Sequence, residues 1–181
     1  MRMLAISGSL RARSSHTALL RAAAEQAPEV AEVSIYGGLA DLPHFNLILT
    51  MAPYPLQSGT FAPQLQATDG VLISSPEYAH GVPGVLKNVL NWVVSSGELY
   101  GKPVALISAS PRSTHARASL IETLTVMMAR VVPEASITLP LCSHELDQAG
   151  VLSHPEIAGA MSASVLAFAS AIDSGRDQTS V

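Results

Sequence analysis

The sequence predicts an α/β fold built on a parallel, doubly wound sheet of about five strands. Short apolar runs alternate with segments whose apolar residues recur at helical spacing, which is the pattern of strand–helix–strand units. Two of these runs are followed by loops of glycine, serine and proline rather than by tight hairpin turns. In an open parallel sheet such loops lie at the carboxyl ends of the strands, where ligands bind.

The first part of the chain predicts a strand, a helix and a second strand. Met3 to Ile6 is a short apolar run, typical of a strand buried on both faces. Ser14 or Ser15 can cap a helix that continues to about Ala27, because apolar residues recur there on one face. Val30 to Tyr36 alternates apolar and polar residues, which indicates a strand nearer the edge of the sheet.

The middle of the chain contains its least regular stretch. Residues 39–63 include four prolines and predict mostly loop with one helical turn. A loop this long in a compact domain usually serves a function or an interface. A short helix is predicted from Phe61 to Ala67, a buried strand over Gly70–Ile73, and a helix over Val85–Val94.

The second half continues the alternation. It predicts a buried strand at Val104–Ile107, a helix at Leu120–Val131 and a last strand at Ser136–Leu139. An irregular segment, Leu141–Pro155, and a final helix, Met161–Ile172, follow. The polar tail from Gly175 is expected to be frayed. No internal repeat is present, so residues 1–181 are predicted to form one domain, with 175–181 as its tail.

The composition argues against several classes of protein. Only 13% of the residues are charged and 48% are hydrophobic, which argues against disorder and is compatible with a surface partly covered by a partner subunit. The net charge of −4 and the lack of a basic stripe argue against nucleic-acid binding. No apolar run reaches the roughly 18 residues needed to span a bilayer, so we expect no membrane segment.

Cysteine and histidine usage argues against disulfides and metal sites. Cys142 is the single cysteine, and the six histidines are scattered without metal-ligand spacing. We therefore expect neither an internal disulfide nor a bound metal. Nothing at the N-terminus resembles a signal peptide, so the default expectation is a cytoplasmic protein.

The loop after the first strand has the composition of a phosphate site. Gly8 to His16 brings together small residues, hydroxyls and arginines ahead of a helix. Phosphate is bound by backbone N–H groups, hydroxyl donors and a cation at a helix N-terminus, and this segment offers all three. It lacks both the G-x-G-x-x-G fingerprint and the G-x-x-x-x-G-K-[ST] loop. From the residues alone, a polar turn whose serines merely cap the helix stays an open alternative.

The loop after the third strand, Ser74 to Gly84, is longer than most strand–helix connections, which take about 2–6 residues. Pro76 and Pro83 fix φ at two points, and Gly81 and Gly84 permit close approach of the backbone to a ligand. We therefore expect a preformed binding loop here, with a plain connection as the alternative.

Five motifs, taken together, indicate a family. In order along the chain they are Gly8-Ser9-Leu10-Arg11-x-x-Ser14, Leu42-Pro43-x-Phe45-Asn46, Asp69-Gly70-Val71-Leu72-Ile73, Pro76-Glu77-Tyr78, and Pro83-Gly84-x-Leu86-Lys87-Asn88 with Trp92 beyond. With these motifs the chain resembles the NAD(P)H-dependent FMN reductase family, flavodoxin-like proteins that include quinone and azo-dye reductases. The resemblance is close over residues 1–110 and loose beyond. It implies a three-layer flavodoxin-like fold with strand order 2-1-3-4-5 and FMN at the switch point between strands 1 and 3.

The resemblance also implies which residues bind FMN. The phosphate-binding set is Ser9, Arg11 and Ser14, with Ser15 and His16 beside them; the segment along the isoalloxazine ring is Pro76, Glu77 and Tyr78, continued by Ala79 and His80; and Ser110 belongs to a third loop, Ser108–Ser110. No side chain is expected to be catalytic, because flavin N5 carries the chemistry.

The implied activity is that of an FMN-dependent NAD(P)H oxidoreductase. Two electrons would pass to a quinone, a free flavin, an azo compound or a similar small-molecule oxidant. Sites of this family lie at a dimer interface, so a homodimer or a dimer of dimers is expected. Two alternatives stay open: an FMN-binding electron carrier that does not oxidise NAD(P)H by itself, and a flavodoxin-like binding or regulatory subunit that has lost FMN.

The sequence departs from the family pattern in three places. His16 stands where the family commonly has Asn, but a neutral imidazole still donates one hydrogen bond, so phosphate binding is expected to persist. Ala79 and Gly81 replace the more usual Asn and Ser, so the side-chain hydrogen bonds of those residues are lost. Arg112 and Arg117 lie in a loop that lacks the family's glycines and are candidates for contact with the extra phosphate of NADPH.

Overall fold

The computed structural model describes residues 1–47, 61–94, 96–141 and 146–179. Its centre is a parallel sheet, and the strands are β1 (Arg2–Ser7), β2 (Glu32–Tyr36), β3 (Gly70–Ser74), β4 (Pro103–Ser108), β5 (Arg130–Val131) and β6 (Ile137–Thr138). The order is β2-β1-β3-β4-β5, with β6 also paired to β4. The predicted α/β class and the strand order 2-1-3-4-5 are therefore confirmed, with β2 at an edge as its alternating pattern indicated.

The fifth position of the sheet is shared by two short strands. β5 pairs with the beginning of β4 at Val104↔Val131, and β6 pairs with its end at Ile107↔Ile137. A 3₁₀ turn, Pro133–Ala135, separates the two strands. Pro133 has no N–H group and cannot continue the ladder, which accounts for the break. The sequence prediction found the second of these strands, at residues 136–139, and missed the first.

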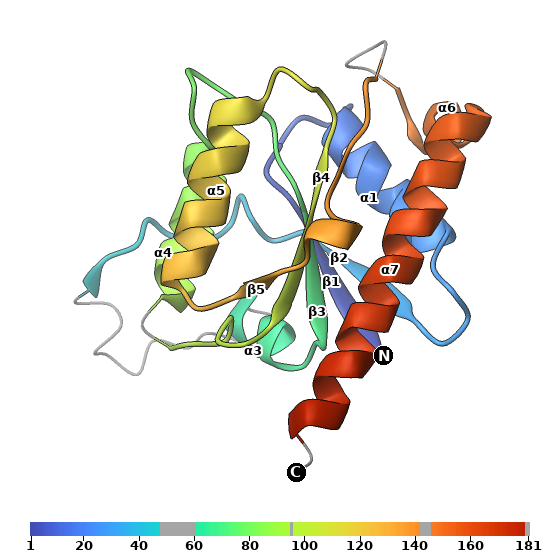
Figure 1. The fold of residues 1–181 in the computed structure, drawn as a ribbon. Helices are drawn as coiled ribbons and strands as arrows, with labels where there is room; N and C mark the ends of the chain where they lie inside the picture. The colour runs from blue at the N-terminus through green and yellow to red at the C-terminus, as the bar shows by residue number, and fades with distance from the viewer. Residues whose placement is uncertain (48–60, 95, 142–145, 180–181) are drawn as a thin grey trace.

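The helices cover both faces of the sheet. They are α1 (Ser15–Glu25), α3 (Phe61–Gln66), α4 (Gly84–Val93), α5 (Thr114–Val126), α6 (Gln148–Leu152) and α7 (Pro155–Thr179). Figure 1 shows α1, α6 and α7 on one side of the sheet and α3, α4 and α5 on the other. The predicted three-layer arrangement is therefore confirmed.

The two cores are built by alternation along the central strands. In β1, Met3 and Ala5 pack toward α1 and α7, whereas Leu4 and Ile6 pack toward α3, α4 and α5. Because the inner positions of the central strands face one core or the other, their middle residues are apolar. A Cβ atom on Gly70 would lie 2.7 Å from Ile172, so glycine at the start of β3 lets α7 approach the sheet closely.

Two predictions for the second half need correction. The helical pattern was extended to Val131, but α5 ends at Val126, and Met128 has a positive φ of 58° that a helix cannot contain. Val131 is instead part of β5. Residues 141–155 were expected to be irregular, yet they include α6, whose N-cap Asp147 accepts a 2.8 Å hydrogen bond from the N–H of Gly150.

Other predictions extend beyond what the structure describes. Most of the predicted loop at 39–63, namely residues 48–60, lies outside the described residues, as does Cys142. α7 continues to Thr179, so residues 175–179 are helical, while the expected fraying of this end stays a prediction. That residues 1–181 form a single domain also stays a prediction.

Helix α7 bears on the expectation that the chain has no membrane segment. By length and composition alone, Pro155–Arg176 is long and apolar enough to cross a bilayer. One such helix is weak evidence, because a buried core helix meets the same criterion. Since Met161, Val165 and Phe168 are fully buried against the sheet, we interpret α7 as a core helix.

Asp69 connects three elements at the end of the sheet opposite the carboxyl ends of the strands. Its Oδ2 accepts a 2.7 Å hydrogen bond from the N–H of Arg2, and its Oδ1 lies 2.7 Å from the guanidinium of Arg176 in α7. Burial raises the pKa of Asp69, but the hydrogen bonds from Arg2 and Arg176 outweigh it, so the pKa lies below its usual value.

A carboxyl group with a lowered pKa predicts a loss of stability in acid. Its contribution is present above the unfolded-state pKa of about 3.9 and disappears as the pH falls through the lower folded-state value. Chemical unfolding at several pH values should therefore show a shallower acid decline for Asp69→Asn than for the wild type. Asp41→Asn, at an exposed loop position, is the control and should keep the wild-type decline. Identical curves for wild type and Asp69→Asn would contradict this role.

Candidate functional site

A pocket of about 380 Å³ lies at the carboxyl ends of β1, β3 and β4. It is lined by nine of the residues predicted from the sequence, Ser9, Arg11, Ser14, Ser15, His16, Pro76, Glu77, Tyr78 and Ser110, and also by Ala109, Arg112 and Ser113. Three loops that are far apart in the sequence thus meet at one site. The volume falls in the range of about 300–1,000 Å³ that is usual for pockets binding small molecules and cofactors.

The first loop is fixed to the end of β3. The N–H of Gly8 donates a 2.8 Å hydrogen bond to the carbonyl of Ser74. A Cβ atom at position 8 would lie 2.5 Å from the Oγ of Ser75, a distance that real Cβ atoms essentially never show. Glycine at this position therefore allows the loop after β1 and the loop after β3 to form adjacent walls of the pocket.

The N-terminus of α1 has the features of an anion site. Ser14 occupies the N-cap position, as predicted, but its side chain makes no capping hydrogen bond. The hydroxyls of Ser14 and Ser15 are both buried, and neither forms a hydrogen bond within the described part of the protein. N–H groups of the first helical turn carry the positive end of the helix dipole, and Arg11 adds a full charge beside them. Hydroxyls, amides and a cation are therefore available for a phosphate.

His16 is oriented by a contact with Ser74 at the end of β3. Its Nδ1 lies 2.9 Å from the Oγ of Ser74, and both side chains are buried. This contact fixes the plane of the imidazole in the first turn of α1, where it lines the pocket. His16, which stands where the family commonly has Asn, therefore keeps a hydrogen-bonding side chain at the predicted phosphate end of the pocket.

The segment after β3 contains a tight hairpin. Tyr78 and Gly81 exchange two backbone hydrogen bonds of 3.0 Å, and the residues between them, Ala79 and His80, have φ values of 48° and 60°. Two successive positive φ values are those of a type I′ turn, which favours Asn-Gly and strains other residues. Ala79 and His80 do not line the pocket, unlike Pro76, Glu77 and Tyr78, so their predicted place in the binding site stays a prediction.

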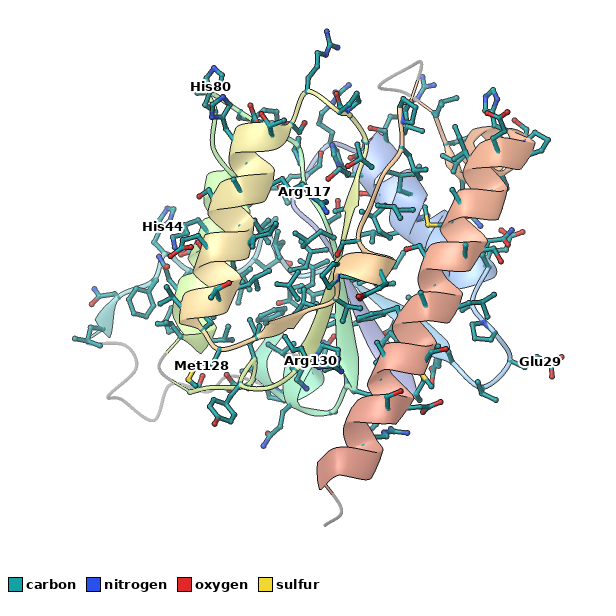
Figure 2. The ribbon with its side chains drawn as sticks, in the orientation of Figure 1. Glu29, His44, His80, Arg117, Met128 and Arg130 are labelled. Carbon is teal, nitrogen blue, oxygen red and sulfur yellow. The ribbon has the colours of Figure 1, made fainter. Side chains whose placement is uncertain are left out.

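Glu77 connects this segment to α5. Its Oε2 accepts a 2.8 Å hydrogen bond from the N–H of Ala116 in the first turn of that helix. Its Oε1 lies 3.5 Å from the Nδ1 of His80, whose ring packs edge-on against His115 at a centroid distance of 4.2 Å. Figure 2 shows His80 on the loop beside the start of α5. The carboxylate thus acts as a helix cap supplied from another loop.

Asn88 connects α4 to the loop after β2. Its side chain accepts from the N–H of Phe45 at 2.7 Å and donates to the carbonyl of Pro43 at 2.9 Å. Trp92, one turn further along α4, donates to the same carbonyl at 2.8 Å and packs edge-on against Phe45. Asn88 and Trp92 are four residues apart and so lie on one helix face, which is the signal that could have indicated a shared partner.

Arg112 and Arg117, the two candidates for contact with the extra phosphate of NADPH, occupy different positions. Arg112 is exposed and lines the pocket, whereas Arg117 lies outside the lining and donates to the Oγ of Ser108 at 3.2 Å. Within the described residues, no group of three or more His, Cys, Asp or Glu side chains could hold a metal ion. Ser113 is a lining residue that the sequence analysis did not identify.

Comparisons with known proteins indicate one family. The family model described as NADPH-dependent FMN reductase matches residues 1–143. An NAD(P)H-dependent FMN reductase from Pseudomonas aeruginosa is 32% identical over 61% of this chain and 60% of its own length. An NADPH:quinone oxidoreductase from Arabidopsis thaliana is 38% identical over 60% of this chain and 57% of its own length. The matches thus span about 60% of these relatives.

A solved structure supports the fold. The flavoenzyme NAD(P)H:(acceptor) oxidoreductase FerB from Paracoccus denitrificans superposes with a TM-score of 0.75. The superposition covers 96% of this chain and 98% of that one, at 24% sequence identity. At this level of identity the similarity concerns the fold.

The cap supplied by Glu77 predicts a graded effect of substitution. Glu77→Ala leaves the first turn of α5 without this acceptor and should lower the free energy of unfolding by about 1 kcal/mol. Glu77→Gln keeps a side-chain oxygen and should lose less. Denaturant unfolding of the three proteins measures the difference. Equal stability of Glu77→Ala and wild type would show that the contact does not cap the helix.

Proposed function

The chain belongs to the NADPH-dependent FMN reductase family, and we propose that it is an FMN-dependent oxidoreductase that oxidises NADH or NADPH and reduces a quinone or a similar small-molecule acceptor. The resemblance seen in its motifs is thus confirmed at the level of the family. The observation that carries the proposal is the uncapped N-terminus of α1, where buried hydroxyls open onto the pocket.

The phosphate end of FMN fits the first loop. Ser14, Ser15 and the first-turn amides of α1 would donate hydrogen bonds, and Arg11 would supply the charge that a phosphate dianion requires. Ser9 lines the same end, although its Oγ already accepts a 3.4 Å hydrogen bond from the N–H of Arg11. His16, held by Ser74, lines the same end of the pocket.

The ring end of FMN fits the walls made by Pro76–Tyr78 and Ala109–Ser110. When bound, FMN supplies hydride acceptance from NAD(P)H and delivery of two electrons to an acceptor. The chain's own part is to hold the ring in a preformed slot, with Pro76 and the Tyr78–Gly81 hairpin limiting its movement. Tyr78 is 53% exposed at the edge of the pocket, where a planar acceptor or a nicotinamide could stack. Hydride transfer to the flavin requires no side chain as an acid.

The proposal also covers the electron acceptor, the oligomeric state and the cellular location of the protein. A quinone is favoured by the names of the relatives, while free flavins and azo compounds follow from the sequence resemblance. We also propose a cytoplasmic homodimer or dimer of dimers. Val94, Val126 and Met128 expose large apolar side chains on or next to α4 and α5, which is compatible with a partner subunit there. Light scattering at micromolar concentration measures the mass that decides this.

A phosphate site predicts discrimination between FMN and riboflavin, which lacks the phosphate. The wild type should bind FMN more tightly, and Arg11→Ala should weaken FMN binding about tenfold or more without changing the affinity for riboflavin. Quenching of flavin fluorescence measures both affinities. Arg21→Ala, at an exposed position of α1 outside the pocket lining, is the control for the change in net charge. Equal affinity of the wild type for the two flavins would contradict the proposed site.

A further inference from the structure

Arg117 is a positive charge placed behind the pocket. It lies on the first turns of α5, is partly buried, and extends toward the carboxyl end of β4 (Figure 2). Its guanidinium donates a 3.2 Å hydrogen bond to the Oγ of Ser108, the last residue of β4. A small cavity of about 20 Å³ beside it is lined by Ser75, Ser108, Ser113 and Arg117, among others.

The hydroxyl of Ser108, which accepts a hydrogen bond from this guanidinium, is neutral. Among the described residues, no carboxylate forms an ion pair with Arg117. The carboxylate of Glu77 accepts from the N–H of Ala116, the residue before Arg117, and is approached by His80. Burial lowers the pKa of Arg117, although a guanidinium stays protonated in proteins. A partly desolvated cation with a neutral hydrogen-bond partner is costly to fold, and a negative charge on a bound ligand would offset part of that cost.

The position of Arg117 relates it to both walls of the ring end. Ser108, which it contacts, is followed directly by the lining residues Ala109 and Ser110. Ala116, its neighbour in the helix, is held by the lining residue Glu77. The partly buried charge is therefore adjacent to both the segment after β3 and the segment after β4. In such a place a charge acts strongly on its surroundings, because water screens it poorly.

We propose that Arg117 stabilises the negative charge that two-electron reduction gives to a flavin bound in this pocket, and so favours reduced over oxidised FMN. This inference rests on the proposed function. Arg117 acts across Ser108–Ser110 without touching the ring, so it is a positioning residue for charge rather than a catalytic residue. Arg112, exposed on the rim, is the better placed of the two arginines for the extra phosphate of NADPH.

The readout is the midpoint potential of the bound flavin, measured by anaerobic titration against a reference dye. Arg117→Met removes the charge and keeps much of the bulk, Arg117→Gln removes the charge and keeps a donor, and Arg117→Lys keeps the charge. The neutral variants should lose about tenfold in their preference for reduced FMN, which for a two-electron couple is about 30 mV. Arg117→Lys should restore most of this loss. Arg21→Met, the same substitution at an exposed position, should leave the potential unchanged.

The outcomes separate this inference from the proposed function. Failure of the wild type to bind FMN would refute the proposed function and this inference with it. If the wild type binds FMN but Arg117→Met and Arg117→Gln have its potential, only the inference is refuted. A charge-independent effect, in which Arg117→Lys falls as far as Arg117→Met, would likewise refute it. Failure of both neutral variants to fold would also overturn it, since the guanidinium would then serve the fold itself.

Discussion

The pocket depends on the parallel pairing of β1 with β3. This pairing aligns Ser7 with Ser74, so both strands end at the same level and both following loops begin there. The hydrogen bond from the N–H of Gly8 to the carbonyl of Ser74 extends the pairing by one residue into the loops. Because the chain order reverses at this point of the sheet, the two loops diverge and leave a crevice between them. α1 starts at this crevice, and its N-terminus provides the anion-binding end.

The two ends of the pocket use positive charge in different ways. At the α1 end, Arg11 is accessible and stands beside open amides and hydroxyls, which suits the fixed charge of a phosphate. At the other end, Arg117 contacts Ser108 from outside the pocket lining, and the charge we propose to act on reduced flavin comes from there. Glu77 is the one acidic residue of the lining, and its carboxylate is used to cap α5. The pocket lining thus has two arginines, Arg11 and Arg112, against one carboxylate, in a chain whose net charge is −4.

The sequence predicted elements that depend on one local rule, such as burial of a strand on both faces. It did not predict features that depend on contacts between residues far apart in the chain. Strands β1, β3 and β4 were predictable because double-sided burial makes them continuously apolar. β5 has two residues, too few for any periodicity, and the apolar spacing of α5 continues past its end at Val126. At the site, the loops after β1, β3 and β4 were recognisable from the sequence, and the family resemblance implied most of the residues that line the pocket. The turn at Ala79–His80 lacks the Asn-Gly signal of its type, and the partner of Asn88 is 43 residues away along the chain.

The central claim is that the pocket holds FMN and lets NAD(P)H reduce it. A visible absorption spectrum of the purified protein, recorded before and after addition of FMN and then of NADPH under nitrogen, tests this most directly. The account predicts bands near ~375 and ~450 nm, as expected of oxidised flavin, that bleach when NADPH is added. Bands that persist with both NADPH and NADH would contradict the reductase and favour an electron carrier. A protein that stays colourless with added FMN would contradict the cofactor itself.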